Sequence, residues 1–339
     1  MKRRPTAERS RREGHRNDVP PQPTNAQPAL SNGRAGHALH LLLMLAALAV
    51  SYLLPFELFL LSYAVLGPLH YLTEISWLHD RRYFLPNRYI ALGLCVIALG
   101  AMFIADAFWL GIIVSGTFVA CAIFALALPS RRLLISLGVS TAVFAFLAAI
   151  GTPFGLAWLL IPTLIHVSLF TLVFMTVGAI RSRSLAQYGL VAAYLTAITV
   201  LIVLPPSAAA VFPQLALAGR YYFGDVAPAL GVVVGLPNLS FDGRIAGLLS
   251  FVYTYHYLNW FIKVDVIRWA AVPKTRMLAI VLASLAATAL YFYDYRIGFM
   301  VLLLLSLTHV LLEFPLNSIS LRQLGGALTK SFGGARAPT

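Results

Sequence analysis

A series of long apolar runs limits how this chain can fold. Each run approaches the roughly 20 residues that a helix needs to cross the hydrocarbon core of a bilayer. The runs show no apolar–polar alternation, which excludes a transmembrane barrel. Bounded by charges, Pro or Gly, the ten runs are at about 37–54, 56–79, 89–105, 106–128, 132–150, 155–180, 187–211, 245–262, 277–293 and 296–317. The sequence therefore predicts an all-α, polytopic integral membrane helix bundle of about ten transmembrane helices.

Composition supports the same fold class. Hydrophobic residues make up 60% of the chain and charged residues only 11%, against about 25% charged in a soluble protein. This excludes a water-soluble enzyme, a secreted disulfide scaffold and a disordered chain. Cys95 and Cys121 both lie within apolar runs and are predicted to be buried thiols. The least certain boundary lies at Asp106, the single charge between the third and fourth runs.

The basic residues predict the orientation. Lys and Arg concentrate in the cytoplasmic loops of membrane proteins. With ten spans and both termini in the cytoplasm, 22 of the 25 Lys and Arg residues fall on the inner side. The exceptions are Arg220, Arg244 and Arg296. We therefore interpret the net charge of +13 as an orientation signal for a bacterial inner (plasma) membrane protein, which contacts membrane lipids and no nucleic acid.

The runs divide the chain into three parts. Residues 1–36 are basic and rich in Pro and Asn, and are predicted to form a disordered cytoplasmic tail. Residues 37–317 form the transmembrane domain, and 318–339 form a cytoplasmic C-terminal tail. The long outside loop at about 212–244 contains several Gly and Pro residues. A loop of this length is either a lid or a simple surface excursion.

Four histidines lie inside apolar runs: His70, His166, His256 and His309. Ionisable residues within spans are costly, and they usually face the interior of a bundle or a cavity. The four occur on even-numbered runs, about 14, 11, 11 and 13 residues from the outer end. At 1.5 Å per residue this spread is only about 4.5 Å in depth. The remaining histidines, His15, His37, His40 and His79, are predicted to lie in the tail or at the interface.

Two carboxylates accompany these histidines. Glu74 follows His70 by four residues, and Glu313 follows His309 by four. Residues at i and i+4 share one helix face, so both acids are expected about 6 Å nearer the cytoplasm than their histidines. Asn259 lies on the face of His256, and Tyr255 beside it is a candidate hydroxyl donor. We take Glu74, Glu313 and Tyr255 as candidate catalytic residues.

This residue set indicates a metal centre. Imidazole suits Fe, Zn, Cu and Ni, and carboxylates suit harder ions. We predict that His70, His166, His256 and His309 bind the metal, with Glu74 and Glu313 as further ligands or as acceptors for the distal N–H groups of the ligands. Fe(II) fits best, while another transition metal or a two-metal centre stays open. The alternative is that each histidine has an independent structural role.

Several motifs are missing from the sequence. It contains no P-loop, no G-x-G-x-x-G before a helix, no cysteine cluster and no G-x-S-x-G elbow. Phosphoryl transfer, nicotinamide binding and serine hydrolysis therefore lack support.

Three segments resemble the Brp/Blh-type bacterial membrane carotenoid (beta-carotene 15,15'-) oxygenases. That family carries a helix motif G-x-x-H-x-x-x-D, and Gly67 to Glu74 has this spacing with Glu in place of Asp. Thr308–Glu313 is similar to the late His-bearing helix, and Tyr255–Tyr257 to an aromatic-His segment. The family's P-H-G order is Leu69-His70-Tyr71 here, and Asn259 or Trp260 stands where a second histidine is usual.

The resemblance implies an Fe(II) centre and O2 chemistry on a lipid-soluble substrate. Independently, a metal layer at mid-membrane is most easily reached from the lipid. Aromatic residues near the layer are candidates for the wall of a tunnel: Tyr71, Trp77, Phe170, Tyr255, Trp260 and Phe314. The sequence thus predicts a membrane-bound, metal-dependent oxidoreductase of the oxygenase or hydroxylase type that acts on a lipid-soluble substrate.

Two other functions stay open. Intramembrane His and Glu also form proton relays in transporters, and broken helices in matching places of two halves would indicate that function. Pro68 and Pro162 each precede a histidine but form no clear repeat. A b-type haem protein with two axial histidines is the other alternative, and a Soret band would identify it.

Overall fold

The computed structural model describes residues 33–333, apart from Pro86, Ala105, Ala127, residues 151–164, Ala216 and residues 218–242. Within these residues every regular element is a helix. This confirms the all-α prediction. The predicted tail lies almost wholly outside the described residues, as does most of the long loop at 212–244.

Single helices match seven of the apolar runs. They are α1 (Arg34–Leu53), α4 (Arg88–Ala101), α5 (Ala107–Ala125), α6 (Ser130–Ile150), α9 (Leu185–Val203), α12 (Gly243–Ile262) and α14 (Lys274–Tyr293). Local signals fix several of their starts. The Asp106 carboxylate accepts hydrogen bonds from the backbone N–H groups of Phe108 and Trp109, so this residue caps α5. The uncertain boundary at Asp106 is therefore a true helix start.

Three runs have a more complex structure. The second comprises α2 (Pro55–Leu61), the π-helix η2 (Ser62–Leu66) and α3 (Gly67–Asp80). The sixth comprises the π-helix η4 (Ile165–Phe170) and α8 (Thr171–Ser182), and the tenth is α15 (Tyr295–Gly333). Short connecting helices are η3 (Arg82–Phe84) and α13 (Val264–Ile267).

Five of these helical segments are long and apolar enough to cross a membrane: Arg34–Leu53, Pro55–Asp80, Leu185–Val203, Lys274–Tyr293 and Tyr295–Ala327. Shorter apolar helices occupy Arg88–Ala101, Phe108–Phe124 and His166–Ser182. The protein therefore has the composition of a helical membrane protein. The count of ten spans and the cytoplasmic placement of both termini stay predictions.

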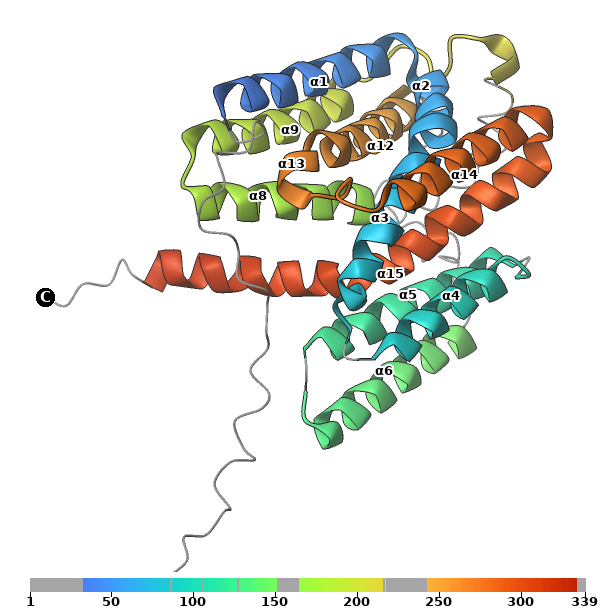
Figure 1. Ribbon diagram of the computed structural model, residues 1–339, viewed down its shortest axis with the longest axis vertical. Coiled ribbons are helices and arrows are strands. Elements are labelled where there is room, and N and C mark those ends of the chain that lie inside the picture. The colour runs from blue at the N-terminus through green and yellow to red at the C-terminus, as the bar shows by residue number, and fades with distance from the viewer. Residues whose placement is uncertain are drawn as a thin grey trace, which may run out of the picture.

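The helices form two groups joined by α15 (Figure 1). In the first group α1 packs on α9 and α12, α8 packs on α9, and α3 packs on α14. In the second group α5 packs on α4 and α6. The helix α15 contacts α3, α8 and α14 on one side and α4 and α5 on the other. This helix therefore connects the two groups by packing against both.

Proline explains two irregularities in the backbone. A proline within a helix removes one N–H donor and crowds the preceding turn. Pro68 follows the π-helix η2 closely, and such π-turns are frequent at functional sites. Pro315 lies inside α15, which bends in Figure 1 between its diagonal and horizontal parts. The helix continues to Gly333, so the domain boundary predicted at 317 is not an end of secondary structure.

Candidate metal centre

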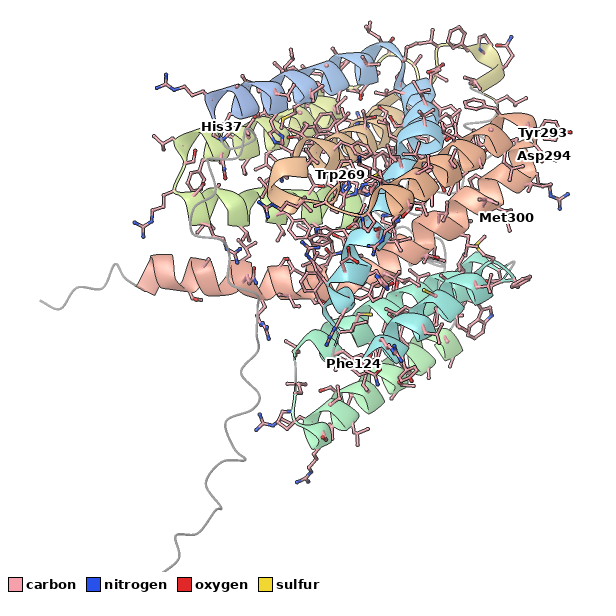
Figure 2. The ribbon with its side chains drawn as sticks, viewed as in Figure 1. His37, Phe124, Trp269, Tyr293, Asp294 and Met300 are labelled. Carbon is pink, nitrogen blue, oxygen red and sulfur yellow. The ribbon has the colours of Figure 1, made fainter. Side chains whose placement is uncertain are left out.

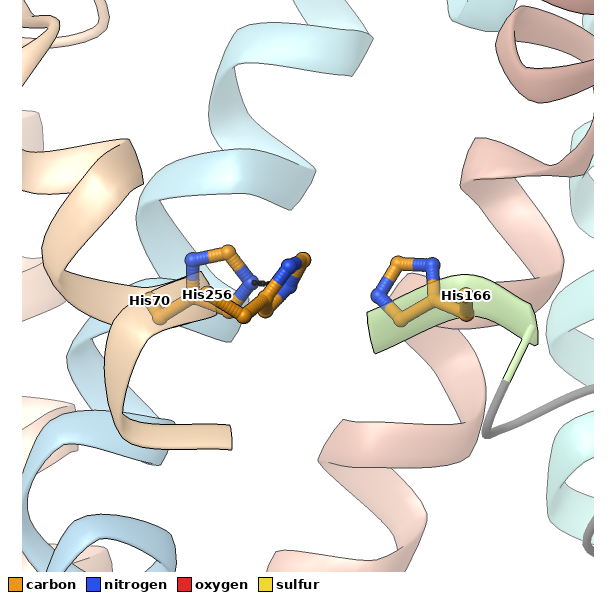
Figure 3. Close-up of side chains that lie close together, drawn as sticks. All are labelled: His70, His166 and His256. Atoms are coloured by element: carbon orange, nitrogen blue, oxygen red, sulfur yellow. Dashed lines mark hydrogen bonds between the residues drawn. The ribbon is translucent and has the colours of Figure 1, made fainter. Parts of the chain in front are cut away.

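The four predicted histidines converge from four separate elements of the fold. His70 comes from α3, His166 from η4, His256 from α12 and His309 from α15. Their ring centroids are 4.8 Å apart for His70–His256, 4.9 Å for His166–His256, 5.0 Å for His166–His309 and 5.3 Å for His70–His309. Figure 3 shows three of them directed toward one another. The four rings thus lie together, and their depth in a membrane stays a prediction.

Ring nitrogens face each other across the centre. The Nε2 atoms of His70 and His256 are 3.2 Å apart, and those of His166 and His309 are also 3.2 Å apart. Metal–nitrogen bonds of about 2.1 Å at right angles place neighbouring ligand atoms roughly 3 Å apart. The observed spacing is therefore compatible with one bound ion or two adjacent ions.

A threonine orients His256. The Thr171 hydroxyl donates a hydrogen bond to the carbonyl oxygen of Val167 at 2.8 Å, and its oxygen lies 2.8 Å from His256 Nδ1. Because that hydroxyl proton is already used, the Thr171 oxygen accepts from the His256 Nδ1–H. This assigns the tautomer from the hydrogen-bond network. The lone pair of His256 Nε2 then faces the centre, as a metal ligand requires.

Both predicted carboxylates lie at the centre. Glu74 Oε2 is 3.1 Å from His70 Nε2, as the i,i+4 spacing predicts. Glu313 Oε2 is 2.8 Å from His166 Nδ1 on a different helix. The two carboxyl groups are also close enough to interact with each other. Two carboxylates in such contact need a proton or a cation between them.

Unpartnered buried atoms test whether the residues fit a metal. The Nδ1 atoms of His70, His166 and His309, and Oε2 of Glu313, are buried without a well-directed hydrogen bond to any described residue. The contact of His166 Nδ1 with Glu313 is thus close in distance but wrong in direction for a hydrogen bond. Buried polar atoms are rarely left in this way. A cation at the centre would satisfy Glu313 Oε2, whereas each of these Nδ1 atoms lies on the opposite side of its ring from the Nε2 atom that faces the centre. The donor set of imidazole nitrogens and carboxylate oxygens fits a metal.

Two overlapping groups could hold a metal ion. In one, ligand atoms of His70, His166 and His256 all lie within 4.8 Å of one another, and in the other those of His70, Glu74 and His309 do. His70 belongs to both groups. The arrangement accommodates one ion or a two-metal centre.

Two tyrosines close one side of the centre. The Tyr71 ring stacks on His309 at 4.4 Å between centroids, and its hydroxyl lies 2.6 Å from that of Tyr257. Gly67 makes room for this ring, because a Cβ there would lie 3.0 Å from the Tyr71 hydroxyl. The G-x-x-H spacing thus has a packing reason in this protein.

Tyr255 requires a correction to its predicted position. Its hydroxyl faces His40 Nδ1 at 3.5 Å, and its ring packs on Phe251 and Tyr194 in a separate cluster beside α1 and α9. Successive residues of a helix do not share a face, and α12 directs Tyr257 rather than Tyr255 toward His70, at 4.9 Å between ring centroids. The hydroxyls closest to the centre are therefore those of Tyr71, Tyr257 and Thr171.

A cavity of about 570 Å³ leads away from the centre. His70, His256, Glu74 and Glu313 line its deep end, and His37, Arg181, Ser182 and Lys263 line it where α1, α8 and α12 begin or end. Of the six aromatic residues predicted to wall a tunnel, Trp77 and Trp260 line this cavity. Tyr71, Phe170, Tyr255 and Phe314 are buried in packing instead.

Sequence reasoning missed three residues here. Thr171 gave no signal beyond its place five residues after His166. His40 was expected at the interface, but it is 5% exposed and lines the cavity. Lys263 also lines the cavity, and burial lowers the pKa of its ammonium group to about 8. The i, i+3, i+7 spacing of His256, Asn259 and Lys263 was the signal that could have placed Lys263 on the same face.

Comparison with known proteins gave no match to this chain among family models, curated proteins or solved structures.

Proposed function

We propose that the protein is an integral membrane metalloenzyme, an Fe-dependent oxidoreductase that uses O2 to oxidise a lipid-soluble substrate. The observation that carries this proposal is the convergence of four imidazoles and two carboxylates, nearly all buried. Two of the imidazoles, His70 and His256, and both carboxylates line a mostly apolar cavity. Independent structural roles for the histidines do not account for the convergence of four rings, with two pairs of Nε2 atoms each 3.2 Å apart.

The choice of iron rests on the donor set. Nitrogen and oxygen donors without thiolate suit Fe(II), whereas Cys95 and Cys121 take no part in the cluster. A bound Fe(II) ion would supply the O2 chemistry. The weak resemblance to carotenoid-cleaving oxygenases in the segments around His70, His256 and His309 favours the same class.

The protein's own residues would do three things around that ion. Thr171 would hold His256 in the tautomer that presents Nε2. Glu74 and Glu313 would complete the ligand set or hold a proton beside it, and Tyr71 and Tyr257 would block one side. The apolar cavity would admit the substrate and keep bulk water away from the reacting atoms.

The convergence of all four rings favours an ion over a haem. A haem needs an open planar slot between two axial histidines. In this cluster the centroids of neighbouring imidazole rings are only 4.8–5.3 Å apart, so the other two imidazoles occupy that space. Absence of a Soret band from protein purified after growth with haem precursors would agree.

Oxygen uptake tests the function. We would reconstitute the protein in lipid nanodiscs with Fe(II), add fractionated lipids from the source membrane, and follow O2 consumption together with product by mass spectrometry. We expect uptake and an oxygen-containing product with at least one lipid fraction, and neither with His256→Ala. Full metal loading without oxidation of any fraction would overturn the oxygenase assignment and leave the metal site intact.

A further inference from the structure

One face of α12 carries polar residues from the histidine centre to the end of the helix. His256, Asn259 and Lys263 follow one another at i, i+3 and i+7, and all three line the cavity. Seven residues of helix cover about 10 Å. Lys263 therefore stands about 10 Å from the metal centre along the wall of the cavity.

Helix α8 also lines the cavity from the histidine centre to the other end. Thr171, which holds His256, marks the deep end, and Arg181 and Ser182 mark the other. The wall between them is made by Phe174, Met175 and Gly178, with Leu190 of α9 and Ile267 of α13. The α8 side of the cavity is thus polar at both ends and apolar between them.

The two ends differ in charge. Both carboxylates of the cavity, Glu74 and Glu313, lie at the deep end and contact His70 and His166. At the other end Lys263 is partly buried, and no described carboxylate lies within ion-pair distance of it. Arg181 binds the neutral amide of Gln323 at 2.7 Å. A partly buried ammonium group with no counter-ion among the described side chains favours an anionic partner.

Asn259 adds a second unpartnered polar group in the same space. Its side chain is 8% exposed, and its Oδ1 atom has no hydrogen-bond partner among the described residues. It lies between His256 and Lys263 on the cavity wall. A ligand that follows this wall would pass its amide.

We propose that the cavity binds an anionic amphiphile, a molecule with a carboxylate or phosphate head group on a hydrocarbon chain. Lys263 binds the head group, with Arg181 lining the same cavity, and the hydrocarbon chain lies along the apolar residues of α8 toward His70 and His256. This inference rests on the proposed function for the role of the ligand as substrate. It restricts the position of oxidation to a carbon about 10–15 Å from the anionic group, because that is the length of helix between the two ends of the cavity.

Binding to metal-free protein tests the proposal separately from catalysis. The full chain would be placed in nanodiscs of neutral phosphatidylcholine, and binding of radiolabelled hexadecanoate would be compared with that of hexadecanol. We expect hexadecanoate to bind at least about tenfold more tightly, because a charge-assisted hydrogen bond at a partly buried cation is lost in the alcohol. Equal binding of the two would overturn the proposal, whether or not the loaded protein consumes O2.

Charge variants locate the binding site. Lys263→Met should weaken hexadecanoate binding by about tenfold. Lys263→Arg keeps the charge and should retain most of the binding, which would show that a variant at this position still folds. Lys274→Met, at the exposed start of α14, is the matched control and should bind as the wild type does. Wild-type affinity in Lys263→Met would contradict the assignment of the head-group site.

Competition then distinguishes the two sources of such an anion. Displacement of hexadecanoate by unlabelled oleate but not by phosphatidylglycerol identifies a free long-chain carboxylate. Displacement by phosphatidylglycerol as well identifies a phosphate-bearing lipid head group as a ligand. Failure of both competitors would show that the label binds outside the cavity and would overturn the proposal.

Discussion

The two helix groups on either side of α15 are built from similarly apolar sequence but differ in what they bury. The group of α3, α8 and α12, together with α15, buries ionisable side chains: His70, Glu74, His166, His309 and Glu313 are each at most 3% exposed. In α4, α5 and α6 the buried polar residues are Ser115 and Thr117. Hydropathy alone does not distinguish the two helix groups. The buried ionisable residues distinguish them, because they occur in the group that contains the histidine cluster.

Exposure shows the same contrast. No residue of α6 whose exposure is described is buried, and α6 contacts α5 along its length (Figure 1). In α12 most residues are buried, from Gly243 to Trp260. Figure 2 places the cavity-lining His37 at one end of this group and Tyr293 with Asp294 at the other. A helix surrounded on all sides can hold groups in a fixed, dry geometry, which a metal site needs.

The largest contrast is expected for removal of a ligand. His309→Ala should lower bound metal to below about a tenth of the wild-type content, because it removes a ligand that belongs to the central cluster. Thr117→Ala in α5 is the control, since the Thr117 hydroxyl donates to the Ile113 carbonyl of its own helix. The measurement is elemental analysis of both purified variants. Equal metal content in the two variants would contradict the placement of the metal site in the helix group that contains His309.

A carboxylate at the centre should have the next largest effect. Glu313→Gln keeps the shape of the side chain but removes its charge beside His166, and we expect metal affinity to fall by about 10- to 100-fold. Glu57→Gln in α2 is the matched change, because that carboxylate accepts the backbone N–H groups of Val211 and Phe212 instead. Metal titration with a competing chelator measures both. An effect of Glu57→Gln as large as that of Glu313→Gln would argue for a general charge effect.

Two threonines of α8 sharpen the comparison within one helix. Thr171 and Thr176 each donate to a carbonyl four residues earlier, but Thr171 also accepts from His256. Thr171→Val should weaken metal binding by about tenfold, the lower range for loss of a partner that orients a ligand. Thr176→Val should leave it unchanged. The same chelator titration applies, and identical affinities would refute the tautomer assigned to His256.

Glycine substitutions test packing with the smallest effect. Gly67→Ala places a Cβ against the Tyr71 ring and should destabilise the protein by about 1–3 kcal/mol. Gly138→Ala in α6 meets no atom within 4 Å and should be neutral or stabilise by up to about 1 kcal/mol. Thermal unfolding in the same detergent gives the direction of each shift. Shifts of the same sign would show that the two groups pack alike.

Sequence reasoning predicted the positions of the helices and the four histidines because both depend on local pattern. Apolar runs identify helices, and an ionisable residue within such a run indicates a buried site. It also predicted the contact of His70 with Glu74, since a single helix fixes the i,i+4 geometry.

Contacts between helices could not be predicted in this way. Glu313 was expected to pair with His309 on its own helix, but its closest nitrogen is Nδ1 of His166. Tyr255 was expected beside the centre, and its place is taken by Tyr257 and Tyr71. Both outcomes depend on how α12 and α15 are rotated relative to their neighbours, which no single-helix pattern encodes. The cavity depends on the same rotations.

The most direct test is the metal content of the wild-type protein. Protein purified from cells grown with adequate iron, without chelators, should contain about one or two metal ions per chain, most of them iron. X-ray absorption at the metal edge should show nitrogen and oxygen neighbours at about 2.0–2.2 Å and no sulfur. A content below about 0.2 metal per chain after reconstitution, for every first-row transition metal tried, would contradict the account.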